Sequence, residues 1–305
     1  MILSLIKSAV FGIVEGLTEF LPISSTGHLI LLDSVMKLSN NIAFTNIFEV
    51  VIQSGAILAV ILIYFKKLWP INKNFGLDKA KLNLWLYIII AFIPAVVFGF
   101  LLKDFIAEKL FNPITVSITL IFYGLVLIVI EKFLNKNRGE NEWEIPNKKE
   151  KKQDKKQKEK QYDRQNEKQD NKSDNKQDIT QNLSIKKALI IGLFQVLAMI
   201  PGTSRSAATI IGGLLVGLSR ENAATFSFFL AIPTIIGAGL FSILDAKIAF
   251  TAEMIYILIV GFVFSFIVAL VVIKAFIKFI QKHTFNLFGW YRIVLGIIVI
   301  ALLVL

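Results

Sequence analysis

The sequence contains no cysteine, which excludes disulfides and thiolate metal sites. It is also poor in charge, since 18% of its 305 residues are charged while 55% are hydrophobic and the mean hydropathy is +0.66. A soluble domain of this length would not be so apolar throughout, so the composition predicts an integral membrane protein. The formal charge of +11 would suggest a nucleic-acid partner for a soluble protein. Here the net charge outside residues 135–182 lies mostly in short loops beside apolar runs, which is typical of the cytoplasmic side of a membrane protein, so no nucleic-acid partner is expected.

Six apolar stretches are long enough to cross a bilayer core, which needs roughly 20 residues. They cover residues 48–65, 84–102, 114–134, 224–244, 254–273 and 288–305. Two further apolar regions, 1–36 and 185–218, are interrupted near their middles by proline, glycine and hydroxyl residues, and each arm is too short to span. We therefore predict an all-α integral membrane protein with six transmembrane helices and two re-entrant helix–turn–helix hairpins.

The distribution of lysine predicts how these segments are oriented. Loops 66–83 and 274–283 and the segment 135–187 are richer in lysine than the loops between them. Lysine-rich loops face the cytoplasm, so we expect both termini outside a prokaryotic plasma (inner) membrane. The first hairpin then enters from outside and the second from inside.

Hairpins that enter from opposite faces imply an inverted-topology repeat, and two weak internal matches support one. Such symmetry is typical of membrane proteins that place their site at the repeat interface, near the midplane. The matches are Gly12–Leu17 with Gly192–Leu197, followed after a one-residue deletion by Pro22 with Pro201 and Ser25 with Ser204, and Phe92–Val97 with Ala231–Ile236.

The predicted domains are two membrane halves, residues 1–134 and 184–305, joined by residues 135–183. Residues 135–182 hold 14 basic and 11 acidic residues, so they carry only a small part of the net charge. This segment is too polar to bury enough apolar surface to offset the loss of chain entropy. We expect a charged, low-complexity linker on the cytoplasmic side.

Glu15 and Glu19 are four residues apart, so on a helix they share a face. Ionisable groups inside apolar sequence are costly and usually mark function. Two neighbouring carboxylates either share a proton, which suits general acid or base chemistry, or bind a divalent cation, which suits phosphate chemistry. The alternative is that both lie at a helix end in water.

Hydroxyl groups follow this pair in the run Ser24-Ser25-Thr26-Gly27, and His28 comes next. A flexible turn of this kind presents hydroxyl and N–H groups to a phosphate, and a helix that begins there attracts anions. The alternative is simple capping of the following helix. A lone histidine is usually structural, but His28 lies beside hydroxyls and near two carboxylates, so a catalytic role is predicted.

Arg205 is the sharpest single signal, because an arginine inside apolar sequence needs an anionic partner and its planar fork suits phosphate oxygens. It is flanked by Ser204 and Ser206 and follows Gly202 and Thr203, which add hydroxyl and backbone donors. The alternative is a structural ion pair with one of the two glutamates. The pair Arg220 and Glu221 is interpreted as ordinary loop charge.

These motifs resemble those of the undecaprenyl-diphosphate phosphatase family of the bacitracin-resistance type. That family has a Glu-rich motif ending in Ser-Ser-Thr-Gly-His and a Pro-Gly-x-Ser-Arg-Ser motif, which Glu15–His28 and Pro201–Ser206 match in full. The resemblance covers the whole chain except the insert at 135–182. It implies hydrolysis of a polyprenyl diphosphate to the monophosphate and inorganic phosphate, which recycles the cell-wall lipid carrier and confers bacitracin resistance. It also implies Mg²⁺ or Ca²⁺ as the cofactor and a site open to the outer face.

On this basis we expect Arg205 to hold the diphosphate, and Glu15 and Glu19 to bind the cation or activate the nucleophile. The nucleophile is Ser25, His28 or a water, with the two side chains favoured. The expected phosphate-binding residues are Ser24, Thr26, Gly202, Thr203, Ser204, Arg205 and Ser206. The prenyl tail would lie against helix faces open to membrane lipids, and the sequence allows a homodimer.

Two rival functions fit parts of the pattern. A secondary transporter or lipid flippase would also have inverted repeats and broken helices around a midplane anion site, although the cluster of hydroxyls and histidine favours chemistry. A phosphatase of the phosphatidic-acid type would share the Ser-Gly-His and Ser-Arg elements. It would also need a second histidine near an aspartate, and the run after Ser206 contains none.

Overall fold

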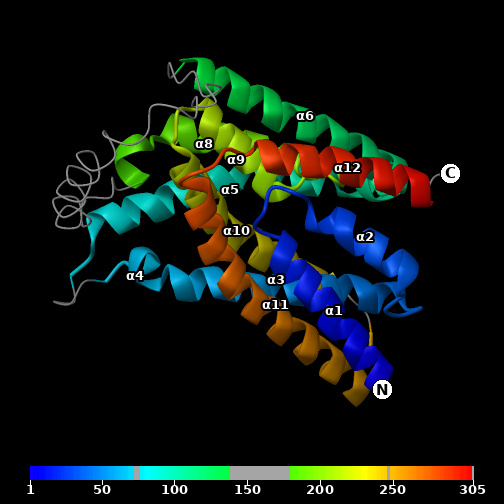
Figure 1. The fold of residues 1–305 in the computed structure, drawn as a ribbon. Coiled ribbons are helices and arrows are strands. Elements are labelled where there is room, and N and C mark those ends of the chain that lie inside the picture. The colour runs from blue at the N-terminus through cyan, green and yellow to red at the C-terminus, as the bar shows by residue number, and fades with distance from the viewer. Residues whose placement is uncertain (72–75, 138–178, 246–247, 304–305) are drawn as a thin grey trace, which may run out of the picture.

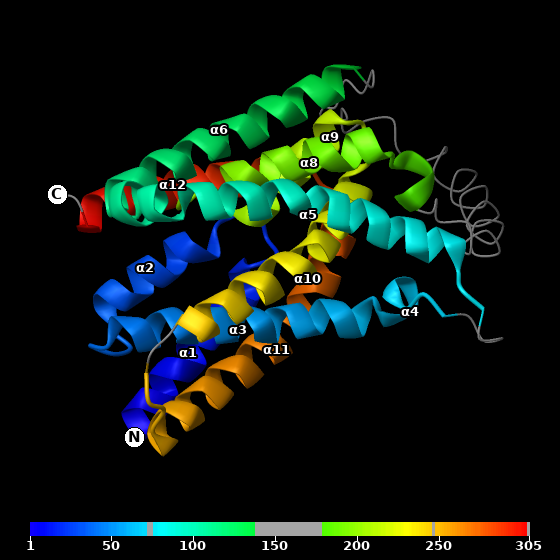
Figure 2. The same cartoon turned by 180° about the vertical axis from the view of Figure 1, so that it is seen from behind.

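The computed structural model describes residues 1–71, 76–137, 179–245 and 248–303. These residues form helices joined by short loops, with no strand among them. The helices run between two ends of the molecule (Figures 1 and 2). One end carries both termini, and the other carries α4 (Phe65–Leu68) and the start of α8 (Ile185–Leu197).

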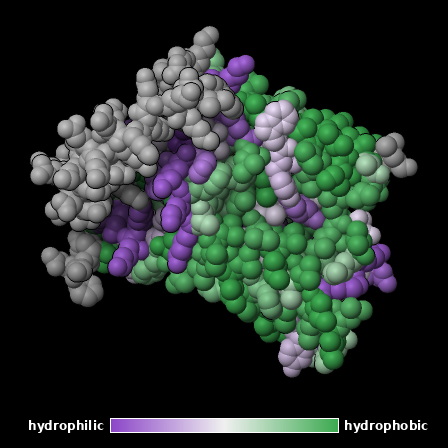
Figure 3. Space-filling model, viewed as in Figure 1, coloured by the Kyte–Doolittle hydropathy of each residue, from purple (hydrophilic) through white to green (hydrophobic). Residues whose placement is uncertain are grey.

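Six helices in the described part of the chain are long and apolar enough to cross a membrane, which confirms the prediction. They are α3 (Ile42–Ile63), α5 (Lys79–Phe105), α6 (Pro113–Asn137), α10 (Arg220–Asp245), α11 (Ala252–Ile280) and α12 (Asn286–Leu303). A short π-helix, η1 (Ile106–Leu110), extends α5. Apolar side chains cover most of the middle of the visible face, with hydrophilic ones toward its ends (Figure 3). The chain is therefore a multi-pass membrane protein.

Two pairs of shorter helices in the described residues coincide with the interrupted apolar regions. α1 (Ile2–Thr18) and α2 (Ser25–Val35) start and finish at the end that carries the termini. α8 and α9 (Arg205–Leu215) start and finish at the opposite end. Both breaks, residues 19–24 and 198–204, therefore lie inside the bundle. Each pair has a helix–turn–helix form, and the two pairs run in opposite directions. That they are re-entrant hairpins in a bilayer stays a prediction.

Packing between the two halves follows a pseudo-twofold pattern. α1 packs on α11 and α8 packs on α5, so the first helix of each half lies on the fourth long element of the other. In both contacts a glycine allows the backbones to meet: Gly12 lies against Gly261, and Gly192 lies against Ala91. A side chain at either glycine would collide with the facing backbone, which is why small residues mark helix contacts in membranes.

The structure corrects the predicted alignment of the repeats. Ser24 and Ser204 are the equivalent N-caps, with φ of 73° and 72°, so the halves align with a constant offset and the deletion that placed Ser25 on Ser204 is wrong. The match of residues 92–97 with 231–236 is also wrong as a repeat. It pairs α5 with α10, whereas by element order α10 is the counterpart of α3.

A buried ion pair closes the bundle at the end opposite the termini. Glu131 on α6 is fully buried and accepts hydrogen bonds from Arg220 Nε at 2.9 Å and Arg220 Nη2 at 2.7 Å. The backbone N–H of Phe285, just before α12, also donates to Glu131 at 3.0 Å. The interpretation of Arg220 as an ordinary loop charge is therefore wrong, because it joins α10 to α6 through a carboxylate that its own loop does not contain.

Most of the predicted linker, residues 138–178, lies outside the described residues. The ends of the predicted segment belong to the folded protein, because residues 135–137 continue α6 and η3 (Ile179–Asn182) precedes α8. Ile179 and Leu183 are buried in the main apolar cluster.

Candidate active site

A cavity of about 220 Å³ lies where the two helix breaks meet. Its wall comes from both hairpins and from α3, α5 and α10. The hairpins contribute Glu19, Ser25, Thr26, Gln195, Ala198, Met199, Pro201, Gly202, Ser204 and Arg205. The spanning helices contribute Gln53, Ala95, Thr234, Ile235 and Ala238. Two motifs that are far apart in the sequence thus border one site.

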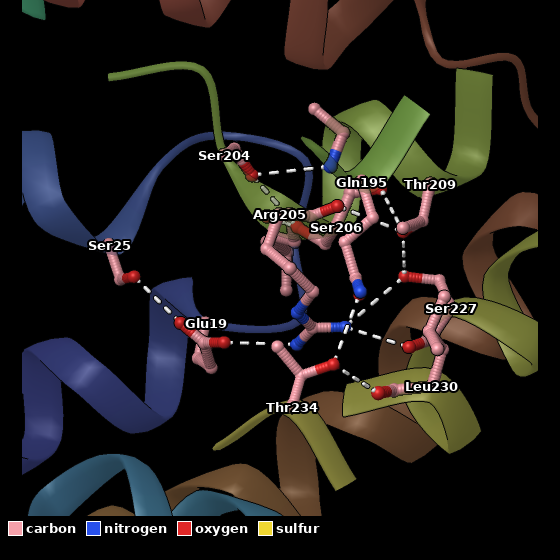
Figure 4. A network of polar contacts seen from close by, with 12 residues as sticks. Glu19, Ser25, Gln195, Ser204, Arg205, Ser206, Thr209, Ser227, Leu230 and Thr234 are labelled. Atoms are coloured by element: carbon pink, nitrogen blue, oxygen red, sulfur yellow. Dashed lines mark hydrogen bonds and ion pairs between the residues drawn. The ribbon is translucent and has the colours of Figure 1, made fainter. Parts of the chain in front are cut away.

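Glu19 connects the two hairpins electrostatically. Its Oε1 accepts a bond of 2.9 Å from Arg205 Nη2, and its Oε2 accepts one of 2.7 Å from Ser25 Oγ (Figure 4). The Glu19 and Arg205 side chains are only 8% and 12% exposed. Removing one partner of such a buried pair costs about 3–5 kcal/mol, because the other charge is left uncompensated. The ion pair proposed as the alternative role of Arg205 is therefore present.

α10 fixes the other side of the Arg205 guanidinium. Arg205 Nη1 donates to the Ser227 carbonyl oxygen at 2.7 Å, and Thr209 Oγ1 donates to Ser227 Oγ at 2.7 Å. The aromatic ring of Phe20 lies 5.9 Å from the guanidinium carbon, which adds a cation–π contact. Arg205 Nε is buried and has no acceptor among the described residues. Glu19 and Ser227 thus hold the guanidinium in place, while its Nε–H has no acceptor in the described part of the chain.

Two helix N-termini point their first turns at the cavity. Ser24 and Ser204 cap α2 and α9, and their hydroxyl oxygens accept bonds from Gly27 N–H at 3.3 Å and Ala207 N–H at 3.2 Å. Both serines have positive φ, a conformation that costs free energy and is found mostly where a site requires it. The N–H groups of a first turn have no intrahelical partner and attract anions.

The predicted phosphate-binding hydroxyls divide into two groups. Thr26 and Ser204 line the cavity, together with the backbone of Gly202. Ser206 instead donates to the Leu21 carbonyl at 2.8 Å, which fastens the second hairpin to the first break. Ser24 and Thr203 are buried and lie outside the cavity lining.

Glu15 lies behind Glu19 and is fully buried. Neither of its carboxylate oxygens has a hydrogen-bond partner among the described residues. An unpartnered buried carboxylate is expensive, so this position favours a neutral carboxyl group or a bound cation over a bare charge. Its counterpart in the second half is Gln195, whose Oε1 accepts from Thr234 Oγ1 at 3.2 Å and whose Nε2 has no partner in the described chain.

His28 is not brought to the cavity. Its Nδ1 lies 2.7 Å from the Ser24 carbonyl oxygen, which makes this nitrogen the donor, and its Nε2 lies 2.6 Å from the Tyr291 hydroxyl. The two rings are stacked, with centroids 5.6 Å apart. Both ring nitrogens are therefore engaged away from Arg205 and Glu19.

Several residues at or near the site were not identified from the sequence. Gln53, Thr234 and Ser227 are polar residues in spanning helices, and no local motif distinguishes them from lipid-facing polar residues. Gln195 had a signal, since the repeat places it opposite Glu15. Arg292 is fully buried in α12 and donates to the carbonyl oxygens of Pro22 and Gly202, in the two breaks.

The fold and the site define the class: a multi-pass membrane protein whose halves enclose a cavity bordered by Glu19, Arg205 and the first turns of two helices. The sequence matches the family described as Bacitracin resistance protein BacA over residues 8–298, and the chain belongs to that family. It is 45% identical to undecaprenyl-diphosphatase 1 of Oenococcus oeni, over 99% of this chain and 98% of that one. It is also 45% identical to undecaprenyl-diphosphatase 1 of Clostridioides difficile, over 98% and 96% of the two chains. Identity to the undecaprenyl-diphosphatase of Enterococcus faecalis is 40%, over 98% and 97%.

Proposed function

We propose that the protein hydrolyses undecaprenyl diphosphate to undecaprenyl phosphate and inorganic phosphate at the cavity between the two breaks. One observation carries the proposal: the first turns of α2 and α9, the second of which begins with Arg205, line a single cavity. Backbone N–H groups at helix N-termini and an arginine fork together suit a phosphate group. The relatives named above are called undecaprenyl-diphosphatases.

The size of the cavity fits a lipid head group and not a whole lipid. Pockets that enclose a drug-sized ligand measure roughly 300–1,000 Å³, whereas this one measures about 220 Å³. The diphosphate would occupy it, and the prenyl chain would extend over apolar helix faces toward membrane lipid. Recycling of the cell-wall lipid carrier and resistance to bacitracin follow from this reaction.

Ser25 is the nucleophile that the geometry favours over His28 and water. It lines the cavity, and its hydroxyl already donates to Glu19 at 2.7 Å. Its oxygen attacks the terminal phosphorus, the bond from that phosphorus to the bridging oxygen breaks, and undecaprenyl phosphate leaves. Glu19 takes the hydroxyl proton. Water then hydrolyses the phosphoserine, which releases inorganic phosphate and restores Ser25.

A divalent cation, Mg²⁺ or Ca²⁺, fits beside this machinery. The orphaned oxygens of buried Glu15 lie next to the Glu19 carboxylate, which is the charged group acting most strongly on Glu15. In the described chain no three acidic or histidine side chains come together as a metal site. Mg²⁺ commonly uses only one or two carboxylates together with substrate phosphates. When bound, the cation would neutralise charge on the phosphate oxygens.

Replacing Arg205 tests the proposal most directly. Loss of one charge-stabilising donor in an active site lowers kcat by roughly 10²–10³-fold. We expect Arg205→Ala to show this loss in phosphate release from undecaprenyl diphosphate in detergent. Arg205→Lys should recover little, because one ammonium cannot reach both Glu19 and the Ser227 carbonyl. Lys66→Ala, a change at an exposed position in α4, is the control.

Near-normal release from both Arg205 variants would refute the site. The assay also separates this function from transport, because detergent micelles sustain no gradient. Uptake into liposomes without hydrolysis would favour the transporter.

Ser25→Ala tests the nucleophile. We expect a loss of at least ~100-fold and no acid-stable phosphoserine after rapid quenching, whereas wild type shows one. Ser34→Ala, on the same helix with an exposed hydroxyl, should stay within twofold. Phosphoserine in neither protein, together with retained turnover in Ser25→Ala, would point to water or His28.

We propose further that both termini face outside and that residues 135–183 lie in the cytoplasm. Because the chain has no cysteine, single cysteines report orientation cleanly. An impermeant maleimide should label Asn40→Cys in intact cells, and Lys66→Cys only after permeabilisation. The opposite pattern would invert the topology.

A further inference from the structure

Arg292 is a buried cation without an anionic partner. It is the largest fully buried side chain in the described structure, and no carboxylate there forms an ion pair with it. Its guanidinium donates only to backbone carbonyl oxygens, at 2.8 Å to Gly202, 3.3 Å to Pro22, and 3.4 Å to Thr119 and Leu120. Burying a full charge against neutral acceptors is costly, so a purely structural position would be better filled by an apolar side chain.

Two of the carbonyl groups that accept hydrogen bonds from Arg292 belong to the two helix breaks. Pro22 belongs to the first break and Gly202 to the second, so one guanidinium joins two turns that enter the bundle from opposite ends. Ser25 and Arg205 each follow three residues after these carbonyls. Both line the cavity, and so does Gly202, which places Arg292 directly behind the cavity wall.

Thr119 on α6 completes the same attachment. Its hydroxyl donates to the Pro201 carbonyl at 2.6 Å, one residue before the Gly202 carbonyl that Arg292 holds. Gly202 has φ of 88°, and its α-carbon faces the Thr119 hydroxyl and the Val116 carbonyl so closely that no side chain fits. The second turn is thus seated against the packed pair α6 and α12, which otherwise stands apart from the cavity.

We propose that Arg292, assisted by Thr119, is a positioning residue that holds the two breaks in register, so that Ser25 and Arg205 face the same phosphate. The proposal rests on the function proposed above. Arg292 does not touch the substrate in this arrangement. It acts through the Pro22 and Gly202 carbonyls, and its uncompensated charge adds to the attraction for an anionic head group across one peptide group.

The test compares Arg292→Met and Arg292→Lys in purified protein, with phosphate release from undecaprenyl diphosphate as the readout. A misplacement of about 1 Å in an active site lowers turnover roughly 100-fold, so we expect kcat of Arg292→Met to fall by about that factor. Arg292→Lys should recover at least about tenfold, because an ammonium still donates to carbonyls and keeps the charge. Wild type is assayed in parallel. If wild type releases no phosphate, the function proposed above is wrong, whereas a difference between active wild type and the Arg292 variants tests the positioning role.

A stability-matched control distinguishes positioning from general destabilisation. Glu131→Gln breaks the buried pair with Arg220, away from the cavity lining, and should lower the unfolding temperature while kcat stays within twofold. Parallel loss of kcat in Glu131→Gln would overturn the proposal, because stability alone would then explain the Arg292 variants. Retention of kcat by Arg292→Met, or equal losses in the Met and Lys variants, would also overturn it.

A milder pair of variants covers the case in which Arg292→Met does not fold. Thr119→Val removes one hydrogen bond to the second break, and we expect kcat to fall about fivefold. Ser117→Ala is its control, since that buried hydroxyl donates only within its own helix, to the Pro113 carbonyl at 2.7 Å. Equal activity of Thr119→Val and Ser117→Ala would contradict the positioning role proposed for Arg292 and Thr119.

Discussion

The ion pair between Glu131 and Arg220 offers the clearest stability prediction. Glu131 is 0% exposed and Arg220 is 17% exposed, and three nitrogen–oxygen contacts of 2.7–3.2 Å join them. Glu131 also accepts from the Phe285 N–H. In Glu131→Gln the charge disappears, and the new amide NH₂ must face a donor on Arg220 or Phe285. The variant therefore removes the buried carboxylate charge that this largely buried guanidinium faces.

Removal of one partner from a buried ion pair costs about 3–5 kcal/mol. The partial exposure of Arg220 places the expected loss near the lower value, about 3 kcal/mol. At roughly 2–4 °C per kcal/mol for chains of 150–250 residues, the unfolding temperature should fall by on the order of 10 °C. Glu108→Gln is the matched control, because Glu108 pairs with Lys109 at a side-chain exposure of 71%. A surface pair contributes about 0–1 kcal/mol, so that change should be small.

Thermal unfolding of both variants in the same detergent, followed by intrinsic fluorescence, measures the difference. Turnover at low temperature should stay within twofold of wild type in both, since neither residue lines the cavity. If Glu131→Gln unfolds at the same temperature as Glu108→Gln, the buried pair contributes no more than a surface pair and the reasoning is wrong.

Three further predictions concern single positions. Gly202→Ala should abolish folding or activity, because its φ of 88° and the adjacent Thr119 leave no room for a methyl group; unchanged activity and stability would contradict this. Tyr291→Phe frees His28 Nε2, so labelling of His28 by diethyl pyrocarbonate should increase, and equal labelling would contradict the bond. The Lys81 N–H donates to Asp78 and holds the pKa of that carboxyl below its usual value of about 3.9. The stability contributed by Asp78 is therefore complete above about pH 5 and is lost as the pH falls through the lowered pKa of Asp78. Melting curves recorded at decreasing pH should show this loss in wild type and not in Asp78→Ala.

Much of the architecture was readable from composition and spacing. Runs of about 20 apolar residues identify spanning helices because a bilayer core admits little else. Proline, glycine and hydroxyls in the middle of an apolar region predicted breaks at residues 21–28 and 201–206 for the same reason. The structure ends both breaks earlier, because α2 begins at Ser25 and α9 begins at Arg205. Loop lysines predicted hairpins of opposite direction, which the two helix pairs have.

The repeat was detected but misaligned. Apolar helices offer many chance matches, so the proline-centred segments of α5 and α10 aligned although they are not counterparts. Backbone conformation settled the register: Ser24 and Ser204 share a positive φ and the same capping role. The equivalence of these two serines is visible in their backbone angles, and the identity of one residue does not determine its backbone angles.

The sequence by itself determined that this is a membrane protein with two broken helices, and it singled out Glu15, Glu19, Ser25, His28 and Arg205 as chemically unusual there. Only the tertiary structure decided how they are used. It placed Glu19 between Ser25 and Arg205, turned His28 toward Tyr291, and set Arg292 behind both breaks. The physical reason is that local sequence fixes helices and turns through short-range sterics and hydropathy. A buried charge, in contrast, takes its partner from whichever carbonyl or carboxylate the packing of distant helices brings within hydrogen-bonding distance.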